Sequence, residues 1–337
     1  MILVTGGTGL LGSHLLHNLV KKGKSVRVFK RSESDLNRIK KTFAIYNDSF
    51  DDYSHQIEFI NGNLLEIHSI REALKEVSQV YHCAALVSFQ PRDKHVIVQT
   101  NYNCTANLVN ACLEIENIQF CYVSSVSTLS LTKQGETLNE TNCWKESRGN
   151  SLYAISKYVA EREVWRATKE GLKAFIVNPS IILGPGDWKT DSSQLIAKVA
   201  KGISFYTEGV MGFVDVRDVA EIMVLLMDVE MKNERFIISS ENLSYKELFK
   251  IITDTFEKKK PSFKLSPCIL QLAWRICYPM TLFGFQPLIT KEIANSASKQ
   301  IFYDNTKIKN FLNYQFIPIK KSVADIGKIF IENQQKS

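Results

Sequence analysis

The sequence predicts an α/β fold, with a doubly wound parallel sheet followed by a smaller, mostly helical C-terminal lobe. Over the first half, short β-rich runs alternate with helical patterns, which indicates parallel strands joined by crossover helices. Glycine is scarce, with 16 residues in 337, yet four of them fall within the first twelve residues. The length suits about two domains, and a composition of 45% apolar and 23% charged residues excludes a disordered chain.

Local patterns place the strands and the first helix. Leu11, Leu15 and Leu19 share one face of a helix over residues 10–22, and Gly23 supplies a stop signal after two lysines. The first strand therefore leads through a glycine-rich turn into an amphipathic helix. Strands are expected at residues 2–5, 25–30, 57–60, 79–83, 119–124 and 174–178.

Helical patterns dominate the second half of the chain. The last of them carries Ile319, Val323, Ile326 and Phe330 on one stripe, so we expect the C-terminal helix to dock on the protein. Helices are expected near residues 191–201, 244–257, 266–284 and 319–335. The expected domains are a sheet domain of residues 1–178 with about 210–240, and a second lobe of residues 179–209 and 241–337.

Charge and cysteine content narrow the classes of partner. Lys and Arg total 42 against 35 Asp and Glu, a formal charge of +7, which suits an anionic ligand but does not predict nucleic-acid binding. The seven cysteines are never spaced CxxC. We therefore expect reduced, buried thiols in a cytoplasmic protein, and neither a disulfide framework nor a metal site. A signal peptide or a membrane span is not expected.

The glycines of the first turn predict a site for a dinucleotide pyrophosphate. Gly6, Gly7, Gly9 and Gly12 lie in the run TGGTGLLG between the first strand and the first helix. Glycine permits the tight turn and the close approach of the backbone, and the helix N-terminus presents free N–H groups and a partial positive charge. This is the arrangement of a Rossmann-type nucleotide-binding domain.

The end of the second strand bears on the choice of cofactor. NAD-binding proteins usually carry an acidic residue near this point for the ribose 2′-hydroxyl, whereas a cation accommodates the 2′-phosphate of NADP. Here the strand ends in Lys30 and Arg31, and Arg38 follows in the next helical stretch. We expect NADP(H), with NAD(H) as the alternative because Glu33 and Asp35 lie close by.

Tyr153 and Lys157 are the candidate catalytic pair. They stand four residues apart in YAISK, so both side chains share one face of a helix. A phenol has a pKa of about 10, and a lysine beside it can favour the phenolate, which makes tyrosine a usable acid or base near neutrality. Ser125 follows the strand at 119–124, at the edge where a parallel sheet binds its ligands, and its hydroxyl can hold the substrate oxygen.

These motifs resemble the extended short-chain dehydrogenases/reductases, the class that contains dihydroflavonol reductases, 3β-hydroxysteroid dehydrogenases and nucleotide-sugar epimerases. The resemblance covers most of the chain, through TGGTGLLG, GNLLE, HCAA, NYNCTAN, VSSVS, YAISK, NPSIILGPG and FVDVRDVA in that order. It implies that Tyr153 exchanges the proton, that Lys157 binds the nicotinamide ribose and that Ser125 orients the carbonyl. The cofactor contacts that we expect are Thr5, Gly6, Gly9, Leu10, Leu11, Gly12, Lys30, Arg31, Arg38, Asn63, Leu64, Ala84, Ala85, Ser124, Tyr153, Lys157, Pro179 and Ile182.

Two features depart from the pattern of this family. Asn63 stands where the family usually has an aspartate that meets the adenine, so we expect an altered adenine contact, since an amide can still donate and accept. Residues 43–56, here called the insertion, form a longer segment than is usual in the family. Its acidic residues Asp48, Asp51 and Asp52 have no assigned role.

The substrate side is more apolar than in nucleotide-sugar enzymes. Those enzymes tend to carry an arginine just before the FVDV-type strand, where the aligned residue here is Met211, and the run NPSIILGPGDW is similar to the reductase branch. Trp188, Phe205 and Tyr206, together with residues 268–285, suggest an apolar pocket. Aromatic residues at such positions also form ordinary core.

The sequence therefore favours an NADP(H)-dependent oxidoreductase that reduces the ketone or aldehyde of a moderately hydrophobic small molecule, or oxidises the alcohol. One alternative is a nucleotide-sugar epimerase or dehydratase with bound NAD, and another is a non-catalytic, NADP-sensing regulatory protein. The resemblance implies a homodimer through the helices at 101–114 and 151–166. Residues 258–264 and 268–285 form either a lid over the substrate or a contact with a membrane surface.

Overall fold

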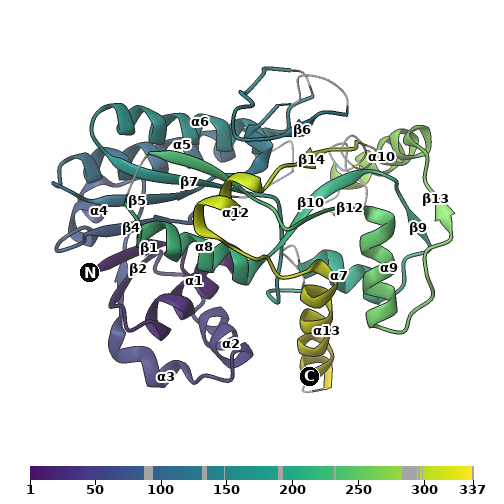
Figure 1. Cartoon of the computed structure of the whole chain (residues 1–337), viewed down its shortest axis with the longest axis horizontal. Helices are drawn as coiled ribbons and strands as arrows, with labels where there is room; N and C mark the ends of the chain where they lie inside the picture. Colours follow the sequence, from purple (N-terminus) through teal and green to yellow (C-terminus); the bar gives the residue numbers. More distant parts are fainter. Residues whose placement is uncertain are drawn as a thin grey trace.

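A seven-stranded sheet, in which each neighbouring pair of strands is parallel, runs through the centre of the protein (Figure 1). The order of the strands reverses between β1 and β4, which is where open α/β sheets bind their ligands. The computed structural model describes residues 1–86, 94–130, 135–147, 149–188, 193–230, 233–282, 294, 297 and 299–335. In spatial order the strands are β11 (Glu234–Ile238), β7 (Lys173–Pro179), β5 (Gln119–Val123), β4 (Gln79–His82), β1 (Ile2–Thr5), β2 (Val26–Lys30) and β3 (Ile57–Asn61).

The fold class and the strands predicted from the sequence are confirmed. Each expected strand is present, with its ends within one residue of the expected positions. The edge strand β11 was not expected. It begins with Glu234 and Arg235, which are half-buried and charged, and only its last three residues are buried. An edge strand needs apolar side chains only where it meets the core, so its pattern is weak.

Helices cover both faces of the sheet (Figure 1). The expected leucine stripe of the first helix is confirmed, because Leu11, Leu15 and Leu19 are buried in the core against the sheet. Helices α5 and α6 pack side by side, and the homodimer expected through them stays a prediction. One face is covered by α1 (Leu10–Lys21), α2 (Asn37–Ile45) and α8 (Val216–Met227), and the other by α4 (Ile67–Ala73), α5 (Lys94–Leu113) and α6 (Leu152–Lys169).

A smaller sheet organises the second lobe. In it, β10 (Val210–Asp215) pairs in parallel with β8 (Ile181–Leu183) and antiparallel with β12 (Glu241–Ser244). The C-terminal helix docks as expected, because Ile319, Val323 and Ile326 are buried in the core of this lobe. The helices described in the lobe are α7 (Ser193–Ala200), α9 (Tyr245–Thr255), α10 (Pro267–Leu282) and α13 (Ile319–Gln335), whereas α12 (Thr306–Leu312) packs against β11 of the central sheet.

Short elements complete the chain, and the elements around β10 bear on the expected division into two domains. Helix α8 packs on the central sheet and β11 is one of its strands, whereas β10 pairs within the small sheet. The division into two domains therefore stays a prediction. The short elements are α3 (Phe50–Tyr53), the 3₁₀ turns Ser54–Gln56 and Val126–Thr128, the pair β9 (Phe205–Tyr206) and β13 (Phe263–Lys264), and the pair β6 (Thr137–Leu138) and β14 (Phe302–Tyr303).

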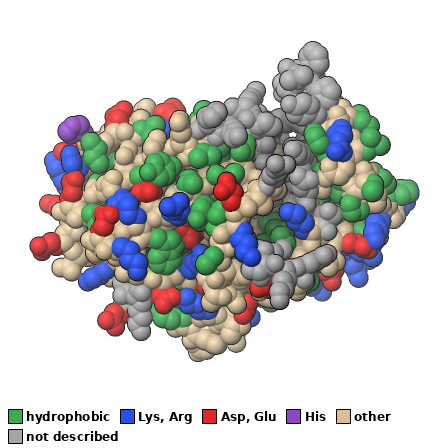
Figure 2. Space-filling view, turned by 90° about the horizontal axis from the view of Figure 1, so that it is seen from above, with side chains coloured by type: hydrophobic (Ala, Val, Ile, Leu, Met, Phe, Trp, Pro, Cys, Tyr) green, Lys and Arg blue, Asp and Glu red, His purple; other side chains and the backbone are tan. Residues whose placement is uncertain are grey.

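Helix α10 carries apolar side chains on an exposed face. Ile269, Leu272 and Ile276 are 50%, 60% and 66% exposed, and Figure 2 shows apolar side chains beside lysine and arginine at the end of the molecule that carries α10 and β13. Residues 283–285 lie outside the described residues, so the role of this segment as a lid or a membrane-surface contact stays a prediction. In the part of the chain that the structure describes, no helix combines the length and the apolar character needed to cross a membrane.

The insertion is held against the helix that follows the glycine turn. On α1, the Nδ1 atom of His14 lies 2.6 Å from the Tyr46 hydroxyl, and the ring of His17 stacks on the Tyr46 ring with centroids 3.9 Å apart. Asp48 lies 2.8 Å from His17 Nε2 and accepts a hydrogen bond of 2.9 Å from Lys21. One acidic residue of the insertion therefore has a structural role, which is to anchor the insertion to α1.

The free energy of unfolding is expected to fall as the pH drops from about 6.5 to about 4, with His14 as a main cause. Burial lowers the pKa of His14 from 6.5 to about 4, so the unfolded chain binds this proton before the folded protein does. The stability that His14 provides is complete above pH 6.5 and is lost as the pH falls to about 4, by about 3 kcal/mol. His82, whose pKa burial lowers to about 3, acts in the same direction.

Urea unfolding of His14→Gln, between about pH 7 and about pH 4.5, measures this effect. The variant should show a flatter dependence of stability on pH than the unaltered protein. His68→Gln is the matched control, because His68 is exposed on α4, and its dependence should match that of the unaltered protein. Equal slopes for His14→Gln and the unaltered protein would contradict the prediction.

Candidate active site

The glycine turn after β1 leaves room only for backbone. Gly6 has a φ of +71°, and a Cβ atom there would lie 2.6 Å from the Ala84 nitrogen. A Cβ on Gly12 would lie 2.1 Å from the Gly6 carbonyl oxygen, the same oxygen that accepts a hydrogen bond of 2.9 Å from the Gly9 N–H. Both contacts are far too short for a side chain, so the geometry of the turn requires glycine at positions 6 and 12.

The N-terminus of α1 fits the pyrophosphate of NAD(P). Its N-cap is Gly9, which has no side chain to cap the helix, and its first turn holds no acidic residue. The backbone N–H groups of Leu10, Leu11 and Gly12 can therefore donate hydrogen bonds to a ligand, and they lie at the positive end of the helix dipole. The chain's own residues thus match the chemistry of the cofactor's anionic centre.

A buried histidine fixes the ends of β1 and β4 at the point where the strand order reverses. Thr5 Oγ1 lies 2.7 Å from His82 Nδ1 and 3.4 Å from the Ala84 N–H, and His82 Nε2 lies 3.1 Å from Thr105 Oγ1. Burial lowers the pKa of His82 to about 3, so the ring is neutral and can bridge two hydroxyls. Ala85 follows on the exposed side of this strand end. His82 and Thr105 were not expected from the sequence.

Asn63 and Leu64 follow β3 on the side where the adenine is expected. Asn63 Oδ1 accepts a hydrogen bond of 3.0 Å from the Leu65 N–H, which makes a local turn. The Leu64 carbonyl oxygen accepts a hydrogen bond of 3.1 Å from Asn107. The asparagine therefore shapes its own loop, and the altered adenine contact stays a prediction.

The three cations expected to bind the 2′-phosphate each have a partner within the protein. Lys30 donates a hydrogen bond of 2.7 Å to Asn61. The side chain of Arg31 is 75% exposed and lies 3.1 Å from Glu33. Arg38 lies 3.8 Å from Asp187, in the loop after β8. The role of these three residues in cofactor choice stays a prediction. The carboxylates of Glu33 and Asp187 would compete with a phosphate for Arg31 and Arg38.

Ser125 and Tyr153 meet although they are 28 positions apart in the chain. Ser151 caps α6 by accepting a hydrogen bond of 3.0 Å from the Ala154 N–H, which places Tyr153 in the first turn of the helix. Ser125 lies two residues after the end of β5, and its hydroxyl oxygen accepts a hydrogen bond of 3.2 Å from the Ser127 N–H. The serine and tyrosine hydroxyls are hydrogen-bonded to each other. The proposed proton donor and the proposed substrate-binding hydroxyl therefore form one group.

Tyr153 is in its protonated form near neutral pH. Burial raises its pKa above the usual value of 10.0, and the hydrogen bond with Ser125 opposes the shift. The lowering expected from Lys157 therefore does not dominate in this structure. The protonated phenol is the form that donates a proton to a carbonyl oxygen.

Lys157 is a buried cation beside β5. Its side chain is 2% exposed, its Nζ donates a hydrogen bond of 2.6 Å to the Val123 carbonyl oxygen, and it lies 4.6 Å from the centroid of the Tyr122 ring. Burial lowers its pKa from 10.5 to about 8, and the negative charge of Glu161 opposes this shift. The ammonium group is therefore mostly charged at pH 7 and loses its proton not far above it.

The remaining expected contacts lie at the carboxyl ends of the strands. Pro179 ends β7 and is buried, and Ile182 lies in β8, where it pairs with Val214 of β10. Ser124 is buried, and its hydroxyl donates a hydrogen bond of 2.5 Å to Glu161 on α6. Glu161 was not expected, although its position four residues after Lys157 places it on the same helical face and supplies a sequence signal for it.

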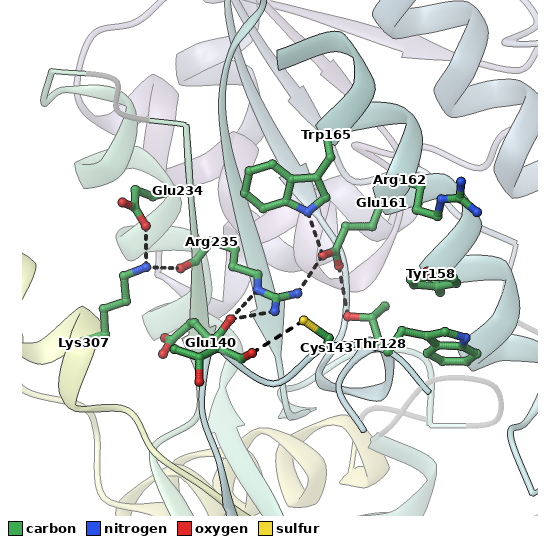
Figure 3. A pocket seen from close by; sticks show the side chains of 12 residues that line it. Thr128, Glu140, Cys143, Tyr158, Glu161, Arg162, Trp165, Glu234, Arg235 and Lys307 are labelled. Atoms are coloured by element: carbon green, nitrogen blue, oxygen red, sulfur yellow. Dashed lines mark hydrogen bonds and ion pairs between the residues drawn. The ribbon is translucent and has the colours of Figure 1, made fainter. Parts of the chain in front are cut away.

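An open cavity of about 620 Å³ lies between α6 and the edge strand β11 (Figure 3). Residues 140–144, α6, β11 and α12 contribute to its walls. Trp144 and Tyr158 stack within it, with ring centroids 4.5 Å apart. The exposed thiol of Cys143 also lines it, so the expectation of buried thiols is wrong for Cys143, as it is for Cys268. The cavity was not expected, because its walls come from segments far apart in the sequence.

Two of the aromatic residues expected to form an apolar pocket, Trp188 and Tyr206, pack against the core of the second lobe. Trp188 makes an edge contact with Phe330, with centroids 4.8 Å apart, and Tyr206 and Met211 pack against the same core. These contacts correspond to ordinary core packing, which was the alternative to an apolar pocket in the sequence analysis. Met211 nevertheless leaves no cation at the position where nucleotide-sugar enzymes tend to carry an arginine.

Comparisons with known proteins agree with this geometry. The profile of the NAD dependent epimerase/dehydratase family matches residues 2–239. The sterol demethylase protein B of Methylococcus capsulatus is 28% identical over 271 residues, which are 80% of this chain and 78% of that protein. A putative dihydroflavonol 4-reductase of Synechocystis is 24% identical, over 96% of this chain and 92% of its own.

Solved structures share the fold over almost the whole chain. The crystal structure of gox2253 matches with a TM-score of 0.81 and 30% identity, covering 99% of this chain and 98% of the other. Solved nucleotide-sugar epimerases share the fold at lower identity; one of them is the UDP-glucose 4-epimerase of Thermus thermophilus in complex with NAD, with a TM-score of 0.73, 19% identity and 98% of each chain covered. The chain therefore belongs to the NAD-dependent epimerase/dehydratase family and is an NAD(P)-dependent enzyme of the extended short-chain dehydrogenase/reductase class.

Proposed function

We propose that the protein is an NADP(H)-dependent reductase of a ketone or aldehyde on a moderately hydrophobic small molecule, or the corresponding alcohol dehydrogenase. The observation that carries the proposal is the hydrogen-bonded pair of Ser125 and Tyr153 at the carboxyl edge of β5, with the buried ammonium of Lys157 on the same helix as Tyr153. Two hydroxyls at this edge can hold one substrate oxygen, and one of them can transfer a proton to it.

Each residue of the site has a separate role in this reaction. The bound nicotinamide cofactor supplies or accepts the hydride, and the N-terminus of α1 would hold its pyrophosphate. Ser125 donates a hydrogen bond to the carbonyl oxygen and fixes its direction. Tyr153, protonated near neutral pH, gives its proton to the same oxygen as negative charge develops there. The buried cation of Lys157 then stabilises the phenolate that remains.

The proposal that the substrate is largely apolar is supported by two observations. Met211, which packs against apolar residues of the second lobe, stands at the position where nucleotide-sugar enzymes tend to carry an arginine for the diphosphate. Two relatives are named as a sterol demethylase protein and as a putative dihydroflavonol 4-reductase, and neither name refers to a nucleotide sugar. A polar, doubly charged nucleotide sugar fits this site less well.

Turnover of a carbonyl panel by the purified protein tests the proposal. NADPH and NADH oxidation should be followed with aryl ketones, alicyclic ketones and aldehydes, and the nucleotide that co-purifies should be identified after denaturation. We expect NADPH-dependent turnover of apolar carbonyls. Tightly bound NAD with conversion of UDP-sugars would overturn the reductase in favour of the epimerase, and NADPH binding without any turnover would favour a non-catalytic sensor.

Arg31 and Glu33 offer a test of cofactor choice, because the two side chains form an exposed ion pair. Arg31→Ala is expected to weaken NADPH binding by about tenfold and to leave NADH binding unchanged, since only NADPH carries the 2′-phosphate. Glu33→Gln should act in the opposite direction, because it releases Arg31 from a competing carboxylate. Dissociation constants measured from nucleotide fluorescence check both variants. Equal losses for NADPH and NADH in Arg31→Ala would count against a phosphate contact.

A further inference from the structure

Glu161 is a buried carboxylate in the middle of α6. Its residue is 3% exposed, and it follows Lys157 by four positions and Tyr153 by eight. Because spacings of four keep side chains near one face of a helix, these three residues point toward the same side of α6. A buried carboxylate needs strong partners to remain charged, and the partners of Glu161 connect it to several elements of the site.

One oxygen of Glu161 gathers three donors from three different elements. Its Oε2 accepts from the Ser124 hydroxyl at 2.5 Å, after β5, and from Asn178 Nδ2 at 3.0 Å, in β7. The Thr128 hydroxyl, in the turn after Ser125, lies 3.0 Å from the same oxygen. This single atom therefore ties the ends of two neighbouring strands and the following turn to α6.

The other oxygen is held by donors at the wall of the cavity (Figure 3). Oε1 accepts a hydrogen bond of 3.2 Å from Trp165 Nε1, and Arg235 Nη1 lies 3.3 Å from it. Arg235 comes from the edge strand β11 and also donates to the backbone oxygens of Glu140 and Asn142, at 2.6 to 2.8 Å. The charge of Glu161 is thus compensated by a cation that is itself fixed in place.

The partners of Oε2 also hold the backbone of Ser125. The Ser125 carbonyl oxygen lies 2.9 Å from the Thr128 hydroxyl and accepts hydrogen bonds from the Thr128 N–H at 3.1 Å and from Asn178 Nδ2 at 3.0 Å. The same two side chains therefore contact the carboxylate on one side and the serine backbone on the other. A shift of Glu161 would move Ser125 relative to Tyr153, which is fixed on the same helix as Glu161.

We propose that Glu161 is a positioning residue of the active site, which sets the placement of Ser125 relative to Tyr153 through the contacts of its Oε2 atom. It does not touch the reacting atoms, and it acts through Ser124, Thr128 and Asn178. The inference rests on the proposed reductase function, because it assigns Glu161 to the same group of side chains. Arg235 would support it from the cavity side.

The effect on Lys157 has a defined direction. Among the described residues, the titratable groups near this ammonium are Glu161 on α6, His82 and Cys83 at the end of β4, and Tyr122 on β5. Tyr153 lies one turn before Lys157 on α6. His82 is neutral because burial lowers its pKa to about 3, and burial keeps the Cys83 thiol protonated by raising its pKa to about 12. Glu161 thus carries the negative charge that opposes the lowered pKa of Lys157. Its removal should let Lys157 lose its proton at a lower pH.

The steady-state kinetics of Glu161→Gln test the proposal. The substitution keeps the size of the side chain, and Asn178 Oδ1, which is buried without a partner among the described residues, can turn to accept from the new amide. We expect kcat to fall by about tenfold or more, since misplacement of reacting groups by about 1 Å costs up to about 100-fold, while NADPH affinity stays unchanged. The alkaline limb of kcat/KM should move to lower pH, because the loss of a nearby negative charge favours the neutral amine of Lys157.

Glu163→Gln is the matched control on the same helix. Glu163 is paired with Arg166 at 2.9 Å, and it should show the kinetics and pH profile of the unaltered protein. Thr128→Val is the second variant, in case Glu161→Gln does not fold, and it should lower kcat by weakening the link to Ser125 without moving the alkaline limb.

The outcomes separate the positioning role from the function itself. If the unaltered protein reduces carbonyls and both Glu161→Gln and Thr128→Val match its kcat, the positioning role is overturned and the reductase stands. If Glu161→Gln is unfolded and Thr128→Val keeps full kcat, the carboxylate is structural and the proposal fails. If the unaltered protein reduces no carbonyl in the panel, the function and the inference built on it are overturned together.

Discussion

Replacing Tyr153 by phenylalanine is expected to lower kcat by about 100- to 10,000-fold, the contribution of a positioned general acid, and to leave the dissociation constant for NADPH within about twofold. The phenylalanine ring keeps the packing of the first turn of α6, whereas the proton donor is lost. Burial holds the pKa of Tyr153 above its usual value, so in the unaltered protein the phenol carries its proton at pH 7. Ser125 can still bind the carbonyl oxygen in the variant, but the phenol that would donate the proton is gone.

Tyr158→Phe is the matched control for this variant. Tyr158 lies on the same helix, but its ring stacks on Trp144 at the wall of the cavity, away from Ser125. Loss of its hydroxyl should leave kcat unchanged. Single-turnover absorbance of NADPH, together with NADPH titration by fluorescence, separates chemistry from cofactor binding. If Tyr153→Phe retains full activity on every carbonyl that the unaltered protein reduces, another residue is the acid.

The sequence could predict those parts of the site whose residues lie close together in the chain, within one element or one turn. The strand, the glycine turn and the first helix follow one another directly, so their period and their glycines are visible in a short window. The pair Tyr153 and Lys157 is visible for the same reason, because four residues make one turn of a helix. Ser125 could be placed because parallel strands align their carboxyl ends at one edge.

The network around Glu161 could not be predicted, because its members are distant in the chain. Arg235 is 74 positions from Glu161. It lies on the edge strand β11, whose weak pattern of apolar residues did not predict a strand. A polar residue in a sequence shows neither that it is buried nor which donors surround it, and burial is what makes these contacts strong. The spacing from Lys157 to Glu161 was the available signal, and it gains meaning only once β5, β7 and β11 are known to meet α6.

The insertion was recognised from its length but not from its contacts. His14 and His17 lie on the buried face of α1 and meet Tyr46 and Asp48, and nothing in the local pattern of either segment predicts that pairing. Tertiary packing decides it, since α2 and the insertion return to the helix that follows the glycine turn (Figure 1).

Gly12→Ala is expected to abolish measurable binding of NADPH, with an affinity at least about 100-fold lower. The added Cβ would lie 2.1 Å from the Gly6 carbonyl oxygen and 2.8 Å from the Gly7 Cα, which are backbone atoms that no side-chain rotation can remove. The N-terminus of α1 must therefore move away from the turn after β1, and the N–H groups that would bind the pyrophosphate lose their common direction. Because those donors act together, a small displacement affects the whole anion site.

Thermal unfolding with and without NADPH, followed by calorimetric titration, measures this loss, since a ligand that binds only the folded state raises its stability. Gly23→Ala is the control at the other end of the same helix. Gly23 has a φ of +75° and no atom within 4 Å of an added Cβ, so alanine there should cost about 1 kcal/mol of stability through backbone strain and leave the NADPH dissociation constant unchanged. A folded Gly12→Ala variant that binds NADPH as tightly as Gly23→Ala would show that the pyrophosphate lies elsewhere. Weak binding in Gly12→Ala alone would assign the anion to the N-terminus of α1, because the two variants differ in which end of the helix they disturb.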